Sequence, residues 1–377
     1  MSRLEDFEWM LSYLKMLDPI NAKILTGLGR YGPRNTSFLA RSLKLPATTV
    51  AFRIRKLIKK GFLQVRTNLE HSRLGLMKGV LIAETAGGLK EKLRDVIGNI
   101  GYWTYAANCF GKFNGIYALF AFPVEFKDRL EAYLEEAARS NAMSSYAFYW
   151  TTDLCEVPRN FDWFDFEKKA WRFPWQRWIT EVLKASEKLP ARLRKPEKYQ
   201  VSVDETDLFL LKELEKNAFV EFTQIASILR MSPQGVRYRY NNHILKRGLI
   251  VDYQIAIFPY PLLVSDMCSF VVHFRNEEAL AKFSNTLSTK PFILSYARII
   301  NQNSLLLHSY TPKTEFPNLI NVLNGLAKSN LINDFFYVNL DISSFTRQTV
   351  SYEFFRDKAW TYNHKEKLKR LAKILHN

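Results

Sequence analysis

A segment of the chain recurs about 186 residues further on, and this duplication constrains the fold more than any other feature. Leu17-Asp18-Pro19-Ile20 corresponds to Val203-Asp204-Glu205-Thr206, and Lys60-Gly61 corresponds to Arg247-Gly248. An offset this long indicates two copies of a whole set of domains, in contrast to the short period of a solenoid. With 377 residues, of which 47% are hydrophobic and 24% charged, the chain can form several ordinary globular domains.

The first copy opens with the pattern of three short helices whose apolar faces could close one core. Three apolar stripes recur at the spacing of a helix with one buried face: Ile24, Leu25 and Leu28; Phe38, Leu39 and Leu43; and Val50, Ile54, Leu57 and Ile58. Asp18 followed by Pro19 is typical of a helix start, and Gly61 after a basic turn is typical of a helix end. The alternation over Phe62–Arg66 then predicts a strand. These signals together predict a winged helix-turn-helix.

Positive charge is concentrated in this first copy. From Pro19 to Asn68 there is no Asp or Glu, yet eleven cations are present: Lys23, Arg30, Arg34, Arg41, Lys44, Arg53, Arg55, Lys56, Lys59, Lys60 and Arg66. A solvated helix face normally mixes both signs, so this run favours a module that binds a polyanion such as duplex DNA. The net charge of +17 and the pI near 9.6 also favour anionic partners.

Each copy continues with a second pattern. Strand-like and helical stretches follow the order strand, helix, strand, strand, helix, strand, which is the ferredoxin-like arrangement. The expected strands are Val80–Glu84, Tyr102–Phe110, Ile116–Phe122 and Tyr146–Thr151 in the first copy, and Cys268–Phe274, Phe292–Ile300, Leu305–Tyr310 and Phe335–Leu340 in the second. An aromatic, basic tail follows each copy.

We therefore expect an α+β protein with two winged helix-turn-helix domains and two ferredoxin-like (βαββαβ) domains in a tandem pseudo-dimer with helical aromatic tails. The expected domains are a winged helix-turn-helix at 1–75, a ferredoxin-like regulatory domain at 76–158, an aromatic and basic helical linker at 159–200, a second winged helix-turn-helix at 201–260, a second ferredoxin-like domain at 261–345, and a basic C-terminal helix at 346–377. One extra residue falls in the second recognition helix near Asn241–His243.

The linker holds half of the eight tryptophans, namely Trp163, Trp171, Trp175 and Trp178. Aromatic side chains interleaved with cations could stack on unpaired bases. Tryptophans at helical spacing more often pack onto a domain, here the adjacent sheet, and we favour that interpretation.

These patterns resemble the Lrp/AsnC family of transcriptional regulators. The resemblance rests on Leu17-Asp18-Pro19-Ile20, on Arg53-Ile54-Arg55-Lys56-Leu57 before Gly61, and on His71-Ser72-Arg73-Leu74-Gly75 in the hinge. It implies DNA binding through the helix-turn-helix, and dimerising regulatory domains that bind a small effector such as an amino acid. The family's effector site lies near a Gly-acid-aromatic-acid turn. In this chain the turn keeps the glycine and the aromatic and lacks both acids, so the candidate effector residues are Gly111, Phe113 and Asn114.

In a helix-turn-helix the second helix enters the major groove, where its side chains meet base edges while flanking cations meet phosphates. In the first copy the residues expected to contact DNA are Arg34, Arg41, Thr48, Thr49, Phe52, Arg53, Arg55, Lys56, Lys59, Lys60 and Arg66. Arg53 is suited to guanine. Phe52 is either a base contact or a packing residue.

In the second copy the corresponding candidates are Ser232, Gln234, Arg237, Arg239, Lys246 and Arg247. Gln234 is suited to adenine. Acids and bases are equal in number over this module. The alternative to DNA binding is therefore that the second helix-turn-helix no longer binds DNA and is kept for packing and pseudo-symmetry.

Other classes of protein are disfavoured by the sequence. No apolar run is long enough to span a bilayer, and Met1–Met10 is acidic where a signal peptide would be basic, so we expect a cytoplasmic protein without a membrane partner. The three cysteines are far apart and odd in number, which favours reduced core residues over a disulfide or metal framework. Walker, paired-Cys and His-Glu-x-x-His motifs are missing, so we expect no enzymatic activity, no cofactor and no metal.

The sequence thus predicts a sequence-specific transcriptional regulator that binds double-stranded DNA. Whether it binds a small-molecule effector and whether it forms further homo-oligomers are left undecided by the sequence. One alternative is a non-specific chromatin-type DNA-binding protein. Another is a tetrapyrrole-binding decarboxylase of related architecture, which should carry basic and His residues near the second strand. The second strand of the first copy, Tyr102–Phe110, contains no basic residue and no His. In the second copy, Tyr296-Ala297-Arg298 offers a single Arg, Arg298.

Overall fold

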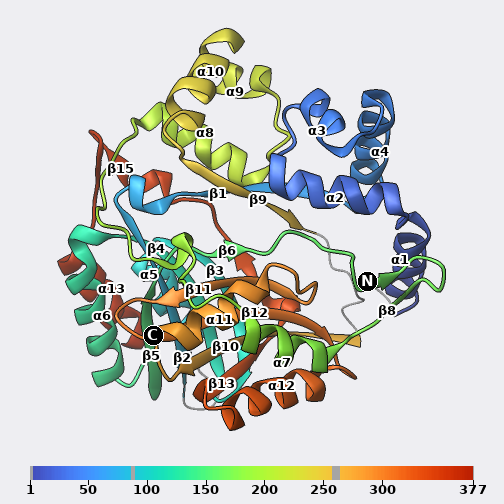
Figure 1. The fold of residues 1–377 in the computed structure, drawn as a ribbon. Coiled ribbons are helices and arrows are strands. Elements are labelled where there is room, and N and C mark those ends of the chain that lie inside the picture. The colour runs from blue at the N-terminus through green and yellow to red at the C-terminus, as the bar shows by residue number, and fades with distance from the viewer. Residues whose placement is uncertain (1–2, 86–89, 257–263, 377) are drawn as a thin grey trace.

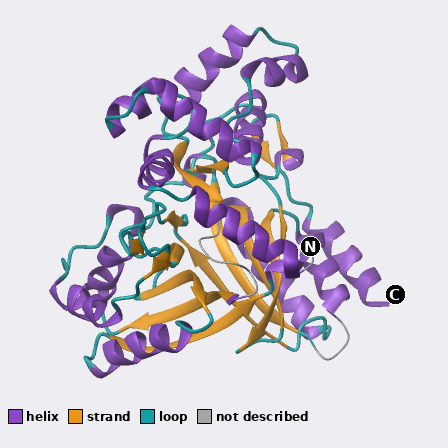
Figure 2. Cartoon of the chain, turned by 90° about the vertical axis from the view of Figure 1, so that its right-hand side faces the viewer, coloured by secondary structure: helices purple, strands orange, loops and turns teal. Residues whose placement is uncertain are grey.

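The structure is a computed structural model that describes residues 3–85, 90–256 and 264–376. Two helical heads lie together on one side of a large antiparallel sheet assembly, and further helices cover its outer faces (Figure 1). The view turned by 90° shows the strands gathered beneath the heads (Figure 2). The expected α+β fold with two winged helix-turn-helix heads and two ferredoxin-like units is confirmed. The expected boundary between residues 260 and 261 lies outside the described residues.

Head 1 follows the helix α1 (Arg3–Met16). It consists of α2 (Pro19–Tyr31), α3 (Thr36–Leu43), α4 (Ala47–Lys59) and the strand β1 (Gln64–Leu69). The Asp18 side chain caps α2 by accepting a hydrogen bond from the Asn21 amide at 2.7 Å. Gly61 ends the helical region with φ +71°, a left-handed conformation that favours glycine.

The expected apolar stripes of head 1 form its core, with two exceptions. Leu28, Leu39 and Val50 are completely buried at the centre of the three helices. Phe38 and Ile58 were expected in the core but are 43% and 40% exposed. Both lie at the edge of a stripe on a short helix, and Phe38 packs edge-on against Tyr31 instead. Head 1 therefore presents apolar as well as basic side chains to its surroundings.

Head 2 repeats this order with α8 (Glu205–Lys216), α9 (Phe222–Leu229), α10 (Pro233–Arg239) and β9 (Ile250–Ala256). A π-helical turn, Tyr240–Leu245, follows α10 directly. A π turn holds one more residue than an α turn, so it absorbs the insertion expected near Asn241–His243.

The two wing strands pair with each other. β1 and β9 form an antiparallel two-stranded sheet in which Arg66 stands opposite Gln254. A second link comes from Arg34, whose Nη2 donates to the Val220 carbonyl at 2.7 Å while its guanidinium lies 4.2 Å from the Phe222 ring centre. The heads are thus joined, and their paired wings form a roof over the sheets.

Below the roof lie two ferredoxin-like units. Unit 1 consists of β2 (Leu76–Glu84), α5 (Lys90–Ile100), β3 (Trp103–Gly111), β4 (Gly115–Pro123), α6 (Lys127–Arg139) and β5 (Ser145–Thr151). Unit 2 consists of β10 (Ser265–Phe274), α11 (Glu277–Leu287), β11 (Ile293–Ile299), β12 (Ser304–Pro312), α12 (Phe316–Lys328) and β13 (Ile332–Leu340). The strand orders are β5-β2-β4-β3 and β13-β10-β12-β11. Because β13 pairs with β3 and β11 pairs with β5, the two sheets close into one ring.

The tail that follows each unit crosses to the other unit. The first tail contains β6 (Cys155–Glu156), β7 (Phe164–Asp165), β8 (Ala170–Trp171) and α7 (Trp175–Lys184); the second contains β14 (Thr346–Arg347), β15 (Phe355–Arg356), β16 (Ala359–Trp360) and α13 (His364–His376). β6 pairs with β11 of unit 2 and α7 packs on α11 and α12, whereas β14 pairs with β3 of unit 1 and α13 packs on α5 and α6. The exchange fastens the two units together.

The linker tryptophans pack onto a domain, as we favoured, but onto the helices of unit 2 as well as its strands. Trp178 is completely buried against Phe283 and Phe292, and its Nε1 donates to Thr286 Oγ1 at 2.8 Å. Cys109, Cys155 and Cys268 are buried. Within the described ranges, no helix has the length and apolar character needed to cross a membrane.

Candidate functional site

A cavity of about 390 Å³ lies between the roof of paired wings and the ring of strands. Arg66 and Gln254 of the two wings line it, as do Lys78 of β2 and Met267 of β10. A more open hollow of about 680 Å³ adjoins it, and Asp153 lines both spaces. Both heads, both units and both tails contribute to the cavity, so no single domain could form it alone.

Cations gather at the unit 1 end of the cavity. Lys78 is buried, and its Nζ lies 3.4 Å from Thr104 Oγ1. Burial lowers the pKa of Lys78, and burial also lowers the pKa of Arg66 to about 10 with a smaller effect from the nearby charge of Arg347. The carboxylates of Asp153 and Glu215 partly offset the effect of burial on Lys78. A buried cation can also bind an anionic ligand, because the ligand restores electrostatic interactions lost with water.

Next to these cations, His71 is held by Asp153. The His71 amide and its Nδ1 lie 2.9 and 2.8 Å from the two carboxylate oxygens of Asp153. Burial alone would raise the pKa of Asp153, but the charges and hydrogen bonds of His71 together with Lys78 hold it below its usual range. Among the described residues, the Nε2 atom of His71 has no hydrogen-bond partner. A histidine oriented by a carboxylate in this way can bind or protonate a ligand.

A buried tyrosine and histidine meet where the two units join. Tyr117 of β4 and His308 of β12 form a 2.6 Å hydrogen bond between the Tyr117 hydroxyl and Nε2, and His308 Nδ1 lies 2.8 Å from Ser295 Oγ. Burial lowers the pKa of His308 to about 4 and raises the pKa of Tyr117. The phenol is therefore protonated and the imidazole neutral at neutral pH, an arrangement that can relay a proton.

The unit 2 end carries an acid. Glu156 lies on β6, and Gln254 Nε2 donates to its Oε1 at 3.0 Å. Burial, with a further contribution from Asp252, raises the pKa of Glu156 to about 7. Arg159 lines the cavity as well, and its charge opposes this rise.

Many of the residues expected to contact DNA lie on the outer surface of the heads. In head 1 the exposed or half-exposed residues are Arg41, Thr48, Thr49, Phe52, Arg55, Lys56, Lys59 and Lys60. In head 2 the exposed residues are Ser232, Gln234, Arg237, Lys246 and Arg247. Ser232 also caps α10 by accepting from the Gly235 amide at 3.0 Å, and Arg247 Nη1 donates to the Ser202 carbonyl at 2.6 Å. Phe52 is 60% exposed, so it does not pack against the neighbouring helix.

Four arginines that were expected to contact DNA instead interact with other parts of the protein or line the cavity. Arg66 lines the cavity, and Arg34 joins the heads, because the paired wings and the head contact draw both side chains inward. Arg53 Nη1 lies 2.6 Å from Asp18 Oδ2, and Arg239 Nη1 lies 2.8 Å from both Asp204 Oδ2 and Asp207 Oδ1. These two arginines tie each recognition helix to the start of the first helix of its own head.

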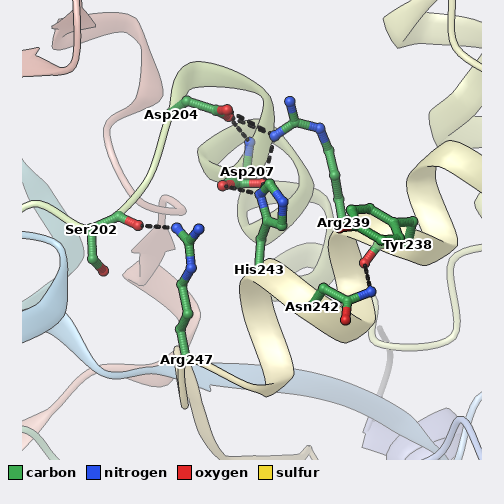
Figure 3. Close-up of polar contacts among 8 residues, drawn as sticks. All are labelled: Ser202, Asp204, Asp207, Tyr238, Arg239, Asn242, His243 and Arg247. Carbon is green, nitrogen blue, oxygen red and sulfur yellow. Dashed lines mark hydrogen bonds and ion pairs between the residues drawn. The ribbon is translucent and has the colours of Figure 1, made fainter.

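Figure 3 shows the Arg239 cluster, in which Arg239 and His243 approach the two carboxylates from neighbouring turns. His243 Nδ1 lies 3.1 Å from both Asp207 oxygens. Asp204, Asp207 and His243 each offer an atom that could bind a metal ion, but the Arg239 guanidinium already provides the counter-charge between the carboxylates.

The candidate effector residues lie elsewhere. Gly111, Phe113 and Asn114 form the β3–β4 turn, where the Glu84 carboxylate accepts from the Asn114 amide at 3.4 Å and Phe113 packs near Phe336. None of the three lines the cavity.

The main residues of the cavity were not identified from the sequence. Lys78 was detectable as a lone lysine within a strand that is otherwise buried. His308 and Tyr117 carried no such signal, because they belong to different units and meet only through the closed ring of strands.

No protein-family model matches the sequence, and no curated protein is similar to it. Among solved structures, the siroheme decarboxylase NirDL is similar over 94% of this chain and 99% of that chain, with a TM-score of 0.51 and 13% identity. The structure of NirDL in complex with an iron-uroporphyrin III analogue gives a TM-score of 0.50 at 12% identity and covers 98% of this chain. LrpC of B. subtilis covers 36% of this chain, with a TM-score of 0.29 and 18% identity.

These comparisons establish the fold, which is shared over almost the full length with NirDL. They also correct one expectation. The sequence led us to expect no enzymatic activity, whereas the full-length match is an enzyme. The missing motifs of common enzymes could not exclude catalysis, because the cavity residues are contributed by separate units and tails.

Proposed function

We propose that the chain is an enzyme that binds a tetrapyrrole with carboxylate side chains in the central cavity and removes carbon dioxide from one of them. The observation that carries this proposal is the cavity itself, in which buried cations lie near a hydrogen-bonded tyrosine and histidine. The full-length similarity of the fold to a siroheme decarboxylase supports the choice of a tetrapyrrole.

Binding would begin with a substrate carboxylate at the unit 1 end. Lys78 and Arg347 line this part of the wall, and hydrogen bonds from charged donors to a carboxylate are stronger than those between neutral groups. The apolar part of the wall, which includes Met267 and Leu294, would contact the face of the macrocycle. The adjoining hollow beyond Asp153 gives a large ligand room to extend.

The chemical step breaks the bond between a side-chain methylene carbon and its carboxylate. Carbon dioxide leaves, the electron pair of that bond remains on the methylene carbon or is delocalised into the macrocycle, and one proton is then added so that a methyl group results. The step therefore needs a proton donor but no oxidant or reductant. Tyr117 is protonated and linked to His308, so this pair would deliver the proton.

The test is to incubate the purified protein, without oxygen, with siroheme and with porphyrins of different carboxylate content. We expect a shifted Soret band on binding and a product lighter by one carboxylate in mass spectrometry. Tyr117→Phe should keep the Soret shift and lose most of the turnover. Tyr105→Phe is the matched control, since Tyr105 lines the same cavity but lies outside the Tyr117–His308 hydrogen bond, and it should retain activity.

If no tetrapyrrole changes its spectrum with the protein, the proposal is wrong. If tetrapyrroles bind but none loses carbon dioxide, the cavity is a binding site and the catalytic part of the proposal fails.

A second function, duplex DNA binding by head 1, has a separate observation in its favour. Within the described part of the chain, the cations Arg55, Lys56, Lys59 and Lys60 on the outer face of α4 make no ion pair with an acid. Such a face can bind phosphates, and Thr48, Thr49 and Phe52 are exposed toward the N-terminal part of the same helix. Gel shifts on random and genomic duplexes at about 0.1 M salt test this proposal. Equal binding to all sequences would favour the non-specific alternative, and no binding would exclude both.

A further inference from the structure

Equivalent positions of the two copies face each other across the cavity, and the strand registers identify them. Lys78 stands opposite Thr151 on β5, as Met267 stands opposite Leu340 on β13. Tyr105 stands opposite Leu119, as Ser295 stands opposite His308. In the tails, Glu156 pairs with Ser295 and Arg347 pairs with Tyr105, so Glu156 and Arg347 are also equivalent.

The equivalent residues differ in chemistry at every one of these positions. Each pair is given with the residue of the first copy before that of the second. The pairs that line the cavity are Arg66 and Gln254, Lys78 and Met267, Tyr105 and Ser295, Leu119 and His308, and, in the tails, Glu156 and Arg347. A duplicated fold would by itself give a symmetric cavity. The differences instead give it two distinct ends.

The unit 1 end is cationic. Besides burial, the nearby charge of Arg347 lowers the pKa of both Lys78 and Arg66, so the three cations lie close together. The carboxylates at this end are those of Asp153, which is paired with His71, and Glu215, whose pKa is raised by burial. A ligand carboxylate placed here would meet an excess of hydrogen-bond donors.

The unit 2 end is apolar with one acid. Met267, Leu294 and Ile342 form a small apolar cluster around the buried ring of Tyr310. Glu156 is the acid, and the nearby charges of Arg159, which also lines the cavity, and of Arg347 partly offset its own. A ligand carboxylate placed against these apolar side chains would lose its water, and it would be repelled by Glu156 above its raised pKa.

Gln254 lies between Arg347 and Glu156. Arg347 Nη1 donates to Gln254 Oε1 at 2.6 Å, and Gln254 Nε2 donates to Glu156 Oε1 at 3.0 Å. This chain of hydrogen bonds joins the equivalent tail residues across the roof, and among the described residues Arg347 and Glu156 form no direct ion pair.

From this polarity we infer the substrate class, an inference that rests on the proposed function: the cavity accepts a tetrapyrrole whose carboxylates are confined to one edge and whose opposite edge is apolar. The acidic edge lies against Lys78 and Arg347, and the alkyl edge lies against Met267, Leu294 and Ile342. The chain would thus act on a macrocycle that has already lost the carboxylates of one edge in an earlier decarboxylation.

The experiment compares two binding probes by titration of their Soret bands with the purified full chain. Mesoporphyrin carries its carboxylates on one edge, whereas uroporphyrin carries them around the whole rim. We expect mesoporphyrin to bind at least about ten-fold more tightly, since uroporphyrin would also bury carboxylates at the apolar end. A buried polar group left without a partner costs about 1–3 kcal/mol, and 1.4 kcal/mol is about ten-fold. Lys78→Met should weaken mesoporphyrin binding by about ten- to a hundred-fold.

The reciprocal variant keeps the inference testable if Lys78→Met does not fold. Met267→Lys places a cation at the apolar end and should improve uroporphyrin binding by about ten-fold, while Met267→Gln, which is polar but uncharged, should not. Uroporphyrin binding as tightly as mesoporphyrin to the natural chain would overturn the one-edge inference and leave the proposed function standing. If neither probe nor siroheme bound, both would be overturned.

Discussion

Replacement of Arg239 by alanine tests the clamp between the recognition helix and the first helix of head 2. The Arg239 Nη1 atom lies within 2.9 Å of Asp204 Oδ1, Asp204 Oδ2 and Asp207 Oδ1, and the Asp207 side chain is only 1% exposed. Removing the arginine leaves the buried Asp207 carboxylate without its guanidinium partner, with His243 Nδ1 still 3.1 Å away. Loss of one partner of a buried pair costs about 3–5 kcal/mol, and the 23% exposure of the Arg239 side chain reduces this to roughly 2–3 kcal/mol.

The matched control is Arg53→Ala in head 1. Arg53 Nη1 is 2.6 Å from Asp18 Oδ2, but the Asp18 side chain is 39% exposed and the residue at the position of Asp207 is the neutral Asn21. Water can therefore solvate Asp18 once the arginine is gone, and the expected cost is about 1 kcal/mol or less. The same substitution should thus destabilise head 2 considerably more than head 1.

Native-state hydrogen exchange measures the two heads separately in the full chain. Amides of α8 and α10 in Arg239→Ala should open about 30- to 100-fold more often, and those of α2 and α4 in Arg53→Ala about five-fold or less. Burial would raise the pKa of Asp204, but hydrogen bonds from the Asp207 amide and from Arg239 outweigh it and lower this pKa. The clamp therefore stabilises the head above the ordinary aspartate pKa. This stabilisation is lost as the pH falls through the lowered pKa. Equal opening of both heads, or a penalty for Arg239→Ala that is unchanged at acid pH, would refute this reasoning.

Three other predictions test the tail, the cavity and the DNA-binding face. Trp178→Ala should cost roughly 3–5 kcal/mol and lower the thermal midpoint, because Trp178 is completely buried and fastens the first tail to unit 2; an unchanged midpoint would contradict the exchanged tails. Because the pKa of Glu156 is raised to about 7, its contribution to stability is complete below the ordinary value of 4.5 and is lost as pH rises through about 7. Glu156→Gln should therefore flatten the decrease in thermal midpoint over this interval. A profile identical to that of the natural chain would contradict this prediction. If head 1 binds DNA, Lys59→Ala should reduce the slope of log affinity against log salt by about one for every sequence tested, with a distant exposed lysine as control.

Apart from Phe38 and Ile58, the local signals of head 1 were reliable where one segment carried the whole pattern. Asp18 and Pro19 start α2 as expected, and Val50, Ile54 and Leu57 bury the expected face of α4. The extra residue expected in the second recognition helix is accommodated in the π-helical turn Tyr240–Leu245. Each of these features depends on backbone geometry and hydrophobic spacing within a few turns, which residue order specifies directly.

Signals that depended on the environment of a side chain were less reliable. Arg53 has the position of a base-reading arginine, yet its guanidinium is bound to Asp18. Arg66 has the position of a wing cation, yet it lies over the cavity because β1 pairs with β9. A cation in a sequence does not indicate whether it will face an anion in solution, an acid of its own domain or a buried space.

The sequence by itself thus determined the duplication, the two kinds of domain and their order, because helical and strand periods and the repeat are properties of residue order. The packing of these domains set the position of the candidate site. The paired wings, the ring of strands and the exchanged tails bring Lys78, Tyr117, His308 and Arg347 to one cavity, although they are separated along the chain and belong to different units. Their chemistry depends on distance, burial and charge in that shared space, which no single segment of the sequence contains.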